Sequence, residues 1–94
     1  MNDDAFEWDD AKAESNFAAH GVSFDMARGV FKDFFAVEWL DERMSYGEDR
    51  FVIIGMVEGR LLCVAYTLRN GKIRIISARG AEPHERRKYH EENS

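Results

Sequence analysis

One carboxylate and a set of arginines in the second half of the chain have the chemistry needed to cleave an RNA phosphodiester. Glu48, or the imidazole of His20, can accept the proton of a ribose 2′-hydroxyl. Guanidinium groups can neutralise charge that develops on phosphate oxygens, and their donor fork matches two such oxygens at once. The candidate catalytic residues are His20, Glu48, Arg50, Arg69 and Arg74.

A second set of residues is suited to holding a nucleic-acid backbone. Lysine and arginine attract phosphates, and a threonine hydroxyl can donate a hydrogen bond to one. The candidate RNA-binding residues are Lys12, Thr67, Lys72 and Arg79. Both sets also fit a plain alternative, a solvated sheet surface on which Glu48 only forms an ion pair with Arg69.

Basic residues concentrate at the C-terminal end of an otherwise acidic chain of 94 residues. Residues 1–68 carry six Lys or Arg against fourteen Asp or Glu, a net charge of −8. Residues 69–94 carry seven against four, a net charge of +3. This split predicts that the C-terminal segment attracts phosphates locally while the body of the protein repels them.

Two tight turns bring the candidate residues together. Glu58-Gly59 and Asn70-Gly71 are typical of two-residue hairpin turns, which fix the register of three strands. Directly paired residues share a face, so Arg50, Thr67 and Arg74 form one row across the sheet. If the strand pairing extends that far, Glu48, Arg69 and Lys72 form the row beside it.

The same register predicts an apolar core on the opposite face, beneath helices. It also places Tyr66 in that core and directs Arg79 toward the helices. The predicted core side chains are Phe51, Ile53, Val64, Tyr66, Leu68, Ile73 and Ile75. Beyond its polar rows, the candidate face turns apolar around Val52, Ile54 and Cys63, and needs the last helix or a partner to cover it.

Helix-capping signals predict the remaining elements. A helix capped by Asp9 or Asp10 ends at His20 before Gly21, with Phe17 on its packing side and Lys12, Asn16 and His20 along one polar line. His20 has an alternative role there, as a helix-terminal side chain that donates a hydrogen bond to the unpaired backbone carbonyls of the last turn. A second helix begins after Ser23 and buries Phe24, Ala27, Phe31 and Phe34, strands cover 6–8 and 35–40, and a polar helix covers 82–92.

These elements predict an α+β fold in which two N-terminal helices pack on a mainly antiparallel twisted sheet, followed by a short C-terminal helix. One domain spans residues 1–94, with 1–5 and 91–94 frayed.

No cofactor signature is present, and the histidines lack metal-ligand spacing with Cys63, which predicts no metal site. Trp8 and Trp39 are interpreted as structural, and the absence of a leader or membrane-spanning run predicts a cytoplasmic protein.

Several strings of residues resemble the BrnT family of bacterial toxins over residues 6–89. The shared strings are Phe6-Glu7-Trp8-Asp9, Lys12-Ala13, Asn16, His20-Gly21-Val22-Ser23-Phe24, Gly47-Glu48 with Arg50, and Ile73-Arg74-Ile75-Ile76-Ser77-Ala78-Arg79. The resemblance implies a RelE-like fold and a metal-independent ribonuclease that arrests translation and growth. It also implies inhibition by a ribbon-helix-helix, BrnA-like antitoxin, in a heterotetramer that contacts DNA only through the antitoxin.

Position by position, the family's polar strings fall on most of the residues that the turn register aligns. They are Lys12, His20, Glu48, Arg50, Thr67, Arg69, Arg74 and Arg79. The chain departs from the family where Ala19, Gly80 and Leu68 replace residues that are often charged. Fewer positive charges favour a slow or impaired toxin. The rival hypothesis is a non-catalytic module that binds a DNA-binding antitoxin and acts as co-repressor.

Overall fold

The computed structural model describes residues 5–42 and 47–94 as a five-stranded sheet with three α-helices and one 3-10 helix. In sheet order β1-β5-β4-β3-β2, β1 runs parallel to β5 and the other neighbouring strands are antiparallel. The expected α+β class is confirmed. The elements are β1 (Phe6–Glu7), α1 (Asp10–His20), α2 (Phe24–Ala27), the 3-10 helix η1 (Arg28–Lys32), β2 (Val37–Leu40), β3 (Phe51–Val57), β4 (Arg60–Arg69), β5 (Lys72–Gly80) and α3 (Pro83–Glu92).

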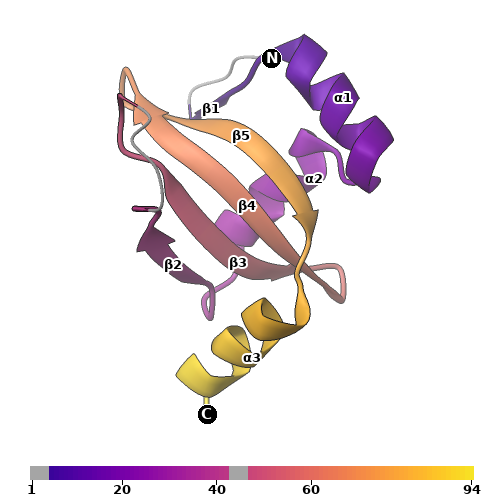
Figure 1. Ribbon diagram of the computed structural model, residues 1–94, viewed down its shortest axis with the longest axis vertical. Helices are drawn as coiled ribbons and strands as arrows, with labels where there is room; N and C mark the ends of the chain where they lie inside the picture. The colour runs from indigo at the N-terminus through magenta and orange to yellow at the C-terminus, as the bar shows by residue number, and fades with distance from the viewer. Residues whose placement is uncertain (1–4, 43–46) are drawn as a thin grey trace.

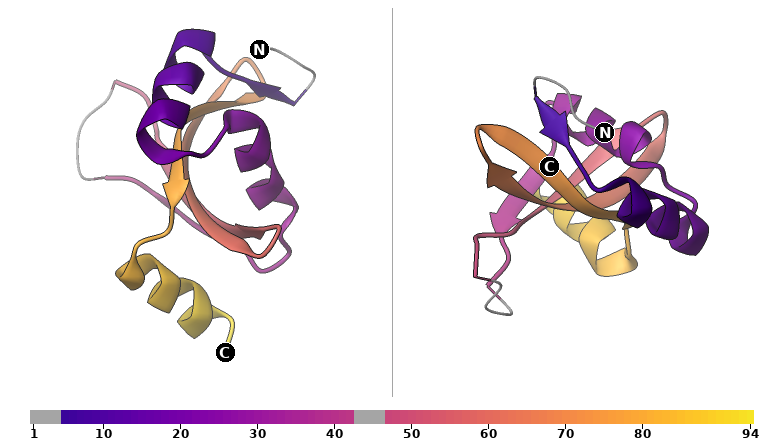
Figure 2. Two further views of the ribbon diagram at one scale, coloured as in Figure 1. Left: turned by 90° about the vertical axis from the view of Figure 1, so that its right-hand side faces the viewer. Right: turned by 90° about the horizontal axis from the view of Figure 1, so that it is seen from above.

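The helices divide the sheet into a back face and a front face, the front face being the one toward the viewer in Figure 1. α2 and η1 cover the back face, α1 packs along β5, and α3 follows β5 at the lower end of the molecule (Figures 1 and 2). The back-face core includes Phe24, Val30, Val64 and Ile75. The upper part of the front face carries no helix.

Caps begin and end the first helices as the sequence predicts. The Asp9 carboxylate accepts a hydrogen bond from the Lys12 backbone N–H at 3.1 Å, and Gly21 ends α1 in the left-handed conformation at φ 69°. The Ser23 hydroxyl oxygen accepts from the Met26 backbone N–H at 3.0 Å and begins α2. These short-range signals therefore fix where the two elements start.

The second helix is shorter than predicted, and the expected burial of Phe34 is wrong. α2 ends at Ala27, η1 continues to Lys32, and the Phe34 side chain beyond it is 93% exposed. η1 lies directly against β3, because a Cβ on Gly29 would sit 2.9 Å from Val57 Cγ1 and one on Gly55 would sit 2.9 Å from Val30 Cβ. This close packing on the sheet ends before Phe34.

α1 also packs differently from the prediction. Phe17 is 56% exposed, whereas Asn16 is only 8% exposed. The Asn16 side chain donates to the Ala78 carbonyl at 2.7 Å and accepts from the Ala78 N–H at 3.1 Å. β1 pairs with β5 only at Ile73 and Arg74, so Asn16 supplies the hydrogen bonds that a neighbouring strand would have made at Ala78.

The predicted turn register is confirmed, but a bulge shifts the end of β5. Val57 pairs with Arg60, and Thr67 with Arg74, as the two hairpin turns require. A register shift at Ala65 and Tyr66 then reverses the alternation along β5. Ala78 therefore points to the back-face core, and the prediction that Arg79 faces the helices is wrong. The prediction that Leu68 belongs to the core is also wrong, because its side chain is 62% exposed.

α3 covers the apolar part of the front face, which the sequence predicted to lie under either the last helix or a partner. Tyr89 and Ala81 pack with Val52, Ile54 and Cys63. The Tyr89 hydroxyl donates to Asp33 Oδ2 at 2.7 Å, which ties α3 to the turn before β2. Residues 91 and 92 are helical, whereas the expectation of fraying at 1–4 lies outside the described residues. Within the described part of the chain, no helix has the length and apolar content to cross a membrane.

Candidate functional site

The acid and two of the candidate arginines meet on the front face where β3 begins and β4 ends. Glu48 Oε1 accepts a hydrogen bond from Arg69 Nη2 at 3.0 Å, and Glu48 Oε2 lies 3.8 Å from Arg50 Nε. The three side chains are between 31% and 46% exposed, so solvent reaches them. Side chains from the two neighbouring rows thus place one carboxylate between two guanidinium groups.

Thr67 and Arg74 continue this arrangement toward the β5 side of the sheet. Thr67 is 2% exposed and its hydroxyl donates to the Asp49 carbonyl, so it holds the segment that carries Glu48 and Arg50. Arg74, its partner on β5, donates from Nη1 to Glu7 Oε2 at 2.6 Å. Glu7 comes from β1 by the parallel pairing, which the sequence patterns did not indicate.

Lys12 lies at the Arg74 end of the site. A hydrogen bond from the Lys12 backbone N–H is the main cause that lowers the pKa of Asp9, and the charges of Lys12 and Arg74 both lower it further. Lys12 and Arg74 therefore act electrostatically on the same carboxylate. Lys72 is paired with Arg69 across the hairpin and completes the outer row.

His20 is separated from Glu48. It is the last residue of α1, one turn beyond Asn16, which is hydrogen-bonded to Ala78 near the end of β5, whereas Glu48 contacts Arg69 beside the start of β5. Tyr66, which the register places in the core, is 7% exposed, and its hydroxyl donates to Glu38 at 2.5 Å. The structure brings Glu48, Arg50, Thr67, Arg69, Lys72 and Arg74 to one region and leaves His20 outside it.

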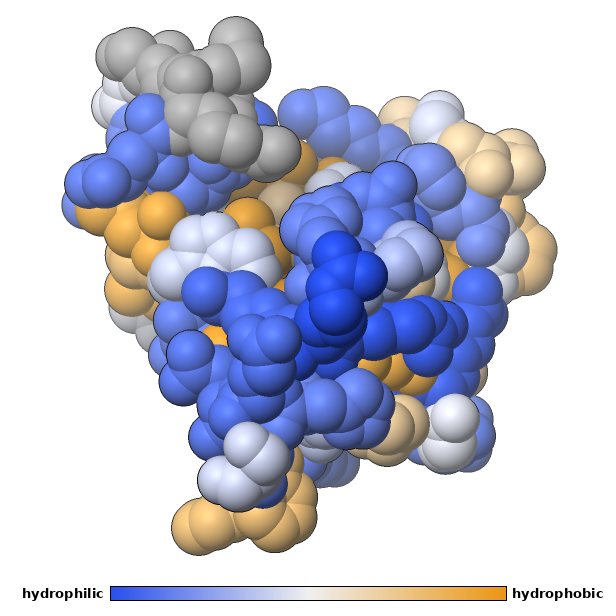
Figure 3. Space-filling view, turned by 60° about the horizontal axis from the view of Figure 1, so that its bottom comes forward, coloured by the Kyte–Doolittle hydropathy of each residue, from blue (hydrophilic) through white to orange (hydrophobic). Residues whose placement is uncertain are grey.

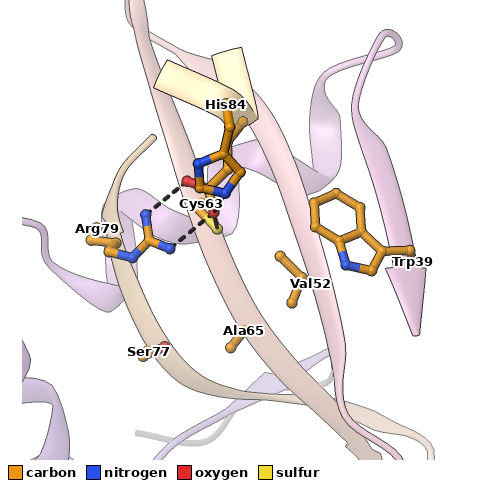
Figure 4. A pocket seen from close by; sticks show the side chains of 8 residues that line it. Trp39, Val52, Cys63, Ala65, Ser77, Arg79 and His84 are labelled. Atoms are coloured by element: carbon orange, nitrogen blue, oxygen red, sulfur yellow. Dashed lines mark hydrogen bonds and ion pairs between the residues drawn. The ribbon is translucent and has the colours of Figure 1, made fainter. Parts of the chain in front are cut away.

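A pocket of about 360 Å³ opens on the front face between the polar rows and α3; we call it the α3 pocket. Trp39 stands on one side and Arg79 on the other, with Val52 and Ala65 between them (Figure 4). Cys63, Ser77, His84 and Glu85 complete its lining. The bulge in β5 therefore gives the front face a further arginine, and the doublet Ile75-Ile76, which interrupts the polar and apolar alternation, is the sequence signal for it.

The Arg79 guanidinium is fixed by a buried carboxylate. Its Nη1 and Nη2 donate to the two oxygens of Glu85 at 2.8 and 2.9 Å. Burial by itself would raise the pKa of Glu85, but hydrogen bonds from Arg79, the Glu82 backbone N–H and Cys63 lower it to about 2. Burial and the nearby Glu85 charge raise the pKa of Cys63 to about 12, so the thiol stays protonated and is a poor nucleophile.

Three possible metal-ligand atoms of Glu82, His84 and Glu85 lie within 4.8 Å of one another. Both Glu85 oxygens already accept hydrogen bonds from Arg79. A cation at this position would have to displace the guanidinium, so the donor set does not favour a metal site.

We predict that the Arg79–Glu85 pair makes the fold acid-labile. The pKa of Glu85 is below its ordinary value of 4.5, so its contribution is complete above pH 4.5 and is lost as the pH falls toward about 2. The loss should be about 3 kcal/mol in the free energy of unfolding. Urea unfolding at pH 5 and pH 2.5 measures it for the wild type, Glu85→Gln and the exposed control Glu91→Gln. An equal loss in all three proteins would contradict this prediction.

The surface at the α3 end of the molecule is mostly hydrophilic, with smaller apolar patches near its margin (Figure 3). α3 contributes three consecutive basic residues, Arg86, Arg87 and Lys88. The front face therefore combines paired arginines, an accessible acid and, on α3, a run of three basic side chains. Such a surface suits a phosphorylated polymer.

Comparison with known proteins identifies the family of this chain. No curated protein sequence matches the chain. A family model described as "Ribonuclease toxin, BrnT, of type II toxin-antitoxin system" matches residues 8–85, a range that contains every candidate catalytic and RNA-binding residue. The chain belongs to the BrnT family of ribonuclease toxins.

Proposed function

We propose that the front face cleaves RNA phosphodiester bonds without a metal ion and thereby inhibits translation and growth. The observation that carries this proposal is the placement of the Glu48 carboxylate between Arg50 and Arg69, one row from Arg74. A base and several fixed positive charges are the groups that such a reaction needs.

In the proposed reaction, Glu48 takes the proton from a ribose 2′-hydroxyl. The 2′-oxygen attacks phosphorus, the bond to the 5′-oxygen breaks, and that oxygen takes a proton from water as it leaves, while Glu48 releases its own proton to solvent. The products are a 2′,3′-cyclic phosphate and a 5′-hydroxyl. Arg50, Arg69 and Arg74 neutralise the charge on the phosphorane, and their charge takes the part that a metal ion plays in other nucleases.

The other candidate residues hold the strand or the site. Lys12, Lys72 and Arg79 attract neighbouring phosphates, while Thr67 positions the segment before β3 through Asp49. Two of the arginines on this face already form ion pairs with carboxylates: Arg74 pairs with Glu7, and Arg79 pairs with Glu85. RNA must compete with these carboxylates, which favours a slow enzyme.

The family implies an antitoxin protein as partner. We propose a RelE-like relationship for the fold and a BrnA-like ribbon-helix-helix antitoxin that forms a heterotetramer with this chain. The net charge of −8 on residues 1–68 repels a DNA duplex, which supports DNA contact through the antitoxin alone.

Incubation of purified protein with RNA in excess chelator tests the proposal. We expect cleavage at the same rate with and without chelator, and products that end in a 2′,3′-cyclic phosphate. Loss of cleavage in chelator would refute metal independence. Binding of an antitoxin without any RNA cleavage would instead support the co-repressor module.

A further inference from the structure

We propose that the α3 pocket binds a nucleobase of the RNA strand, beside the phosphate that the front-face arginines hold. This inference rests on the proposed function. It assigns a role to Trp39, which the sequence alone suggested to be structural.

The pocket has the size and lining of a small-ligand site. Its volume of about 360 Å³ is in the range of pockets that bind drug-sized ligands. The indole of Trp39 forms one wall, and the apolar side chains of Val52 and Ala65 lie between it and Arg79 (Figure 4). An aromatic wall beside apolar side chains is suited to stacking a planar base.

Trp39 is held in place before any ligand binds. Its strand pairs it directly with Val52, and Lys88 Nζ from α3 lies 5.0 Å from the centre of its ring. Ser77 and His84 line the same pocket and can exchange hydrogen bonds with the polar edge of a base. The pocket therefore offers both a stacking surface and hydrogen-bonding groups.

The position of the pocket links it to the cleavage face. Ala65 lines the pocket, and Thr67 lies two residues farther along β4, which is about 7 Å. Thr67 is the cross-strand partner of Arg74. Trp39 lies on β2, three strands from Arg74, but its partner Val52 follows Arg50 by two residues, so a nucleotide whose phosphate contacts Arg50 can place its base against Trp39.

Fluorine NMR on protein labelled with 5-fluorotryptophan tests this inference without altering the fold. The chain contains two tryptophans, and Trp8 is buried in the back-face core, so it serves as an internal reference. The probe is a 2′-O-methylated RNA oligonucleotide of mixed sequence, which cannot be cleaved through its 2′-oxygen. We expect the Trp39 signal to shift saturably while the Trp8 signal stays in place. A Trp39 signal that RNA does not move, but that antitoxin does, would overturn the inference.

Substitutions at Trp39 measure its contribution to affinity. Trp39→Leu should weaken binding of the same oligonucleotide about tenfold, whereas Trp39→Phe, which keeps a ring, should retain most of the affinity. Leu40→Ala is the matched control, because Leu40 is the neighbouring residue of β2, is 41% exposed and does not line the pocket. Unchanged affinity in Trp39→Leu, together with normal cleavage by the wild type, would refute the base pocket alone. A Trp39 shift in a protein that cleaves no RNA would refute the proposed function alone.

Discussion

Arg74→Ala is expected to lower kcat/KM for RNA cleavage by about 10²–10³-fold, the effect of removing one preorganised charge from a developing oxyanion. Arg74 lies on the front face in the row of Thr67, and Glu7 fixes its guanidinium at 2.6 Å. Arg74→Lys should recover only part of the rate, because an ammonium cannot contact two phosphate oxygens through a planar fork. Initial rates on a fluorescent RNA substrate measure these losses.

Loss of Arg74 also leaves Glu7, whose side chain is 16% exposed, without this ion pair, so stability must be separated from catalysis. The double variant Arg74→Ala with Glu7→Gln removes the unpaired charge and should restore the urea midpoint without restoring the rate. Arg28→Ala is the control arginine, since Arg28 pairs with the exposed Asp25 near the back face. A rate that recovers in the double variant would show that Arg74 acts only through the fold.

Local turn chemistry explains why the front-face row could be predicted from sequence. Asn70 and Gly71 have φ angles of 54° and 76°, and Glu58 and Gly59 have 51° and 79°. Positive φ at both central residues is typical of the tight hairpin turn that fixes register. Because a register of this kind sets the face of each residue as far as the next bulge, Thr67 and Arg74 were placed correctly.

The features that the sequence did not reveal depend on contacts between distant segments. The parallel pairing that brings Glu7 to Arg74 joins the first strand to the last strand, and β1 is only two residues long. The burial of Asn16 follows from an unpaired edge of β5 at Ala78, which no local pattern indicates. The bulge in β5 therefore determines the contacts of Arg79, and the unpaired edge of β5 determines how α1 packs. The hairpin turns determine the polar rows.

Exposure of Phe34 and burial of Asn16 also show the limit of periodicity. The α-helical period of 3.6 residues per turn predicted one continuous buried stripe after Ser23. Instead, the α-helix changes after Ala27 into a 3-10 helix, which has three residues per turn. The change occurs where Gly29 and Gly55 allow η1 to lie close to β3. Steric fit to the sheet therefore outweighs the helical repeat in this segment.

Glu48→Gln is expected to lower kcat by about 10²–10⁴-fold with little change in KM, because the amide keeps an acceptor for Arg69 but cannot take a proton. His20→Asn should change kcat by less than about threefold, since His20 lies at the β5 side of the sheet, away from the carboxylate. Glu58→Gln, in the exposed β3–β4 turn, is the control for loss of a carboxylate elsewhere. Steady-state kinetics on all three variants decide between the two candidate bases. A large loss in His20→Asn with a small loss in Glu48→Gln would assign proton abstraction to the imidazole and require α1 to move toward β3 when RNA binds.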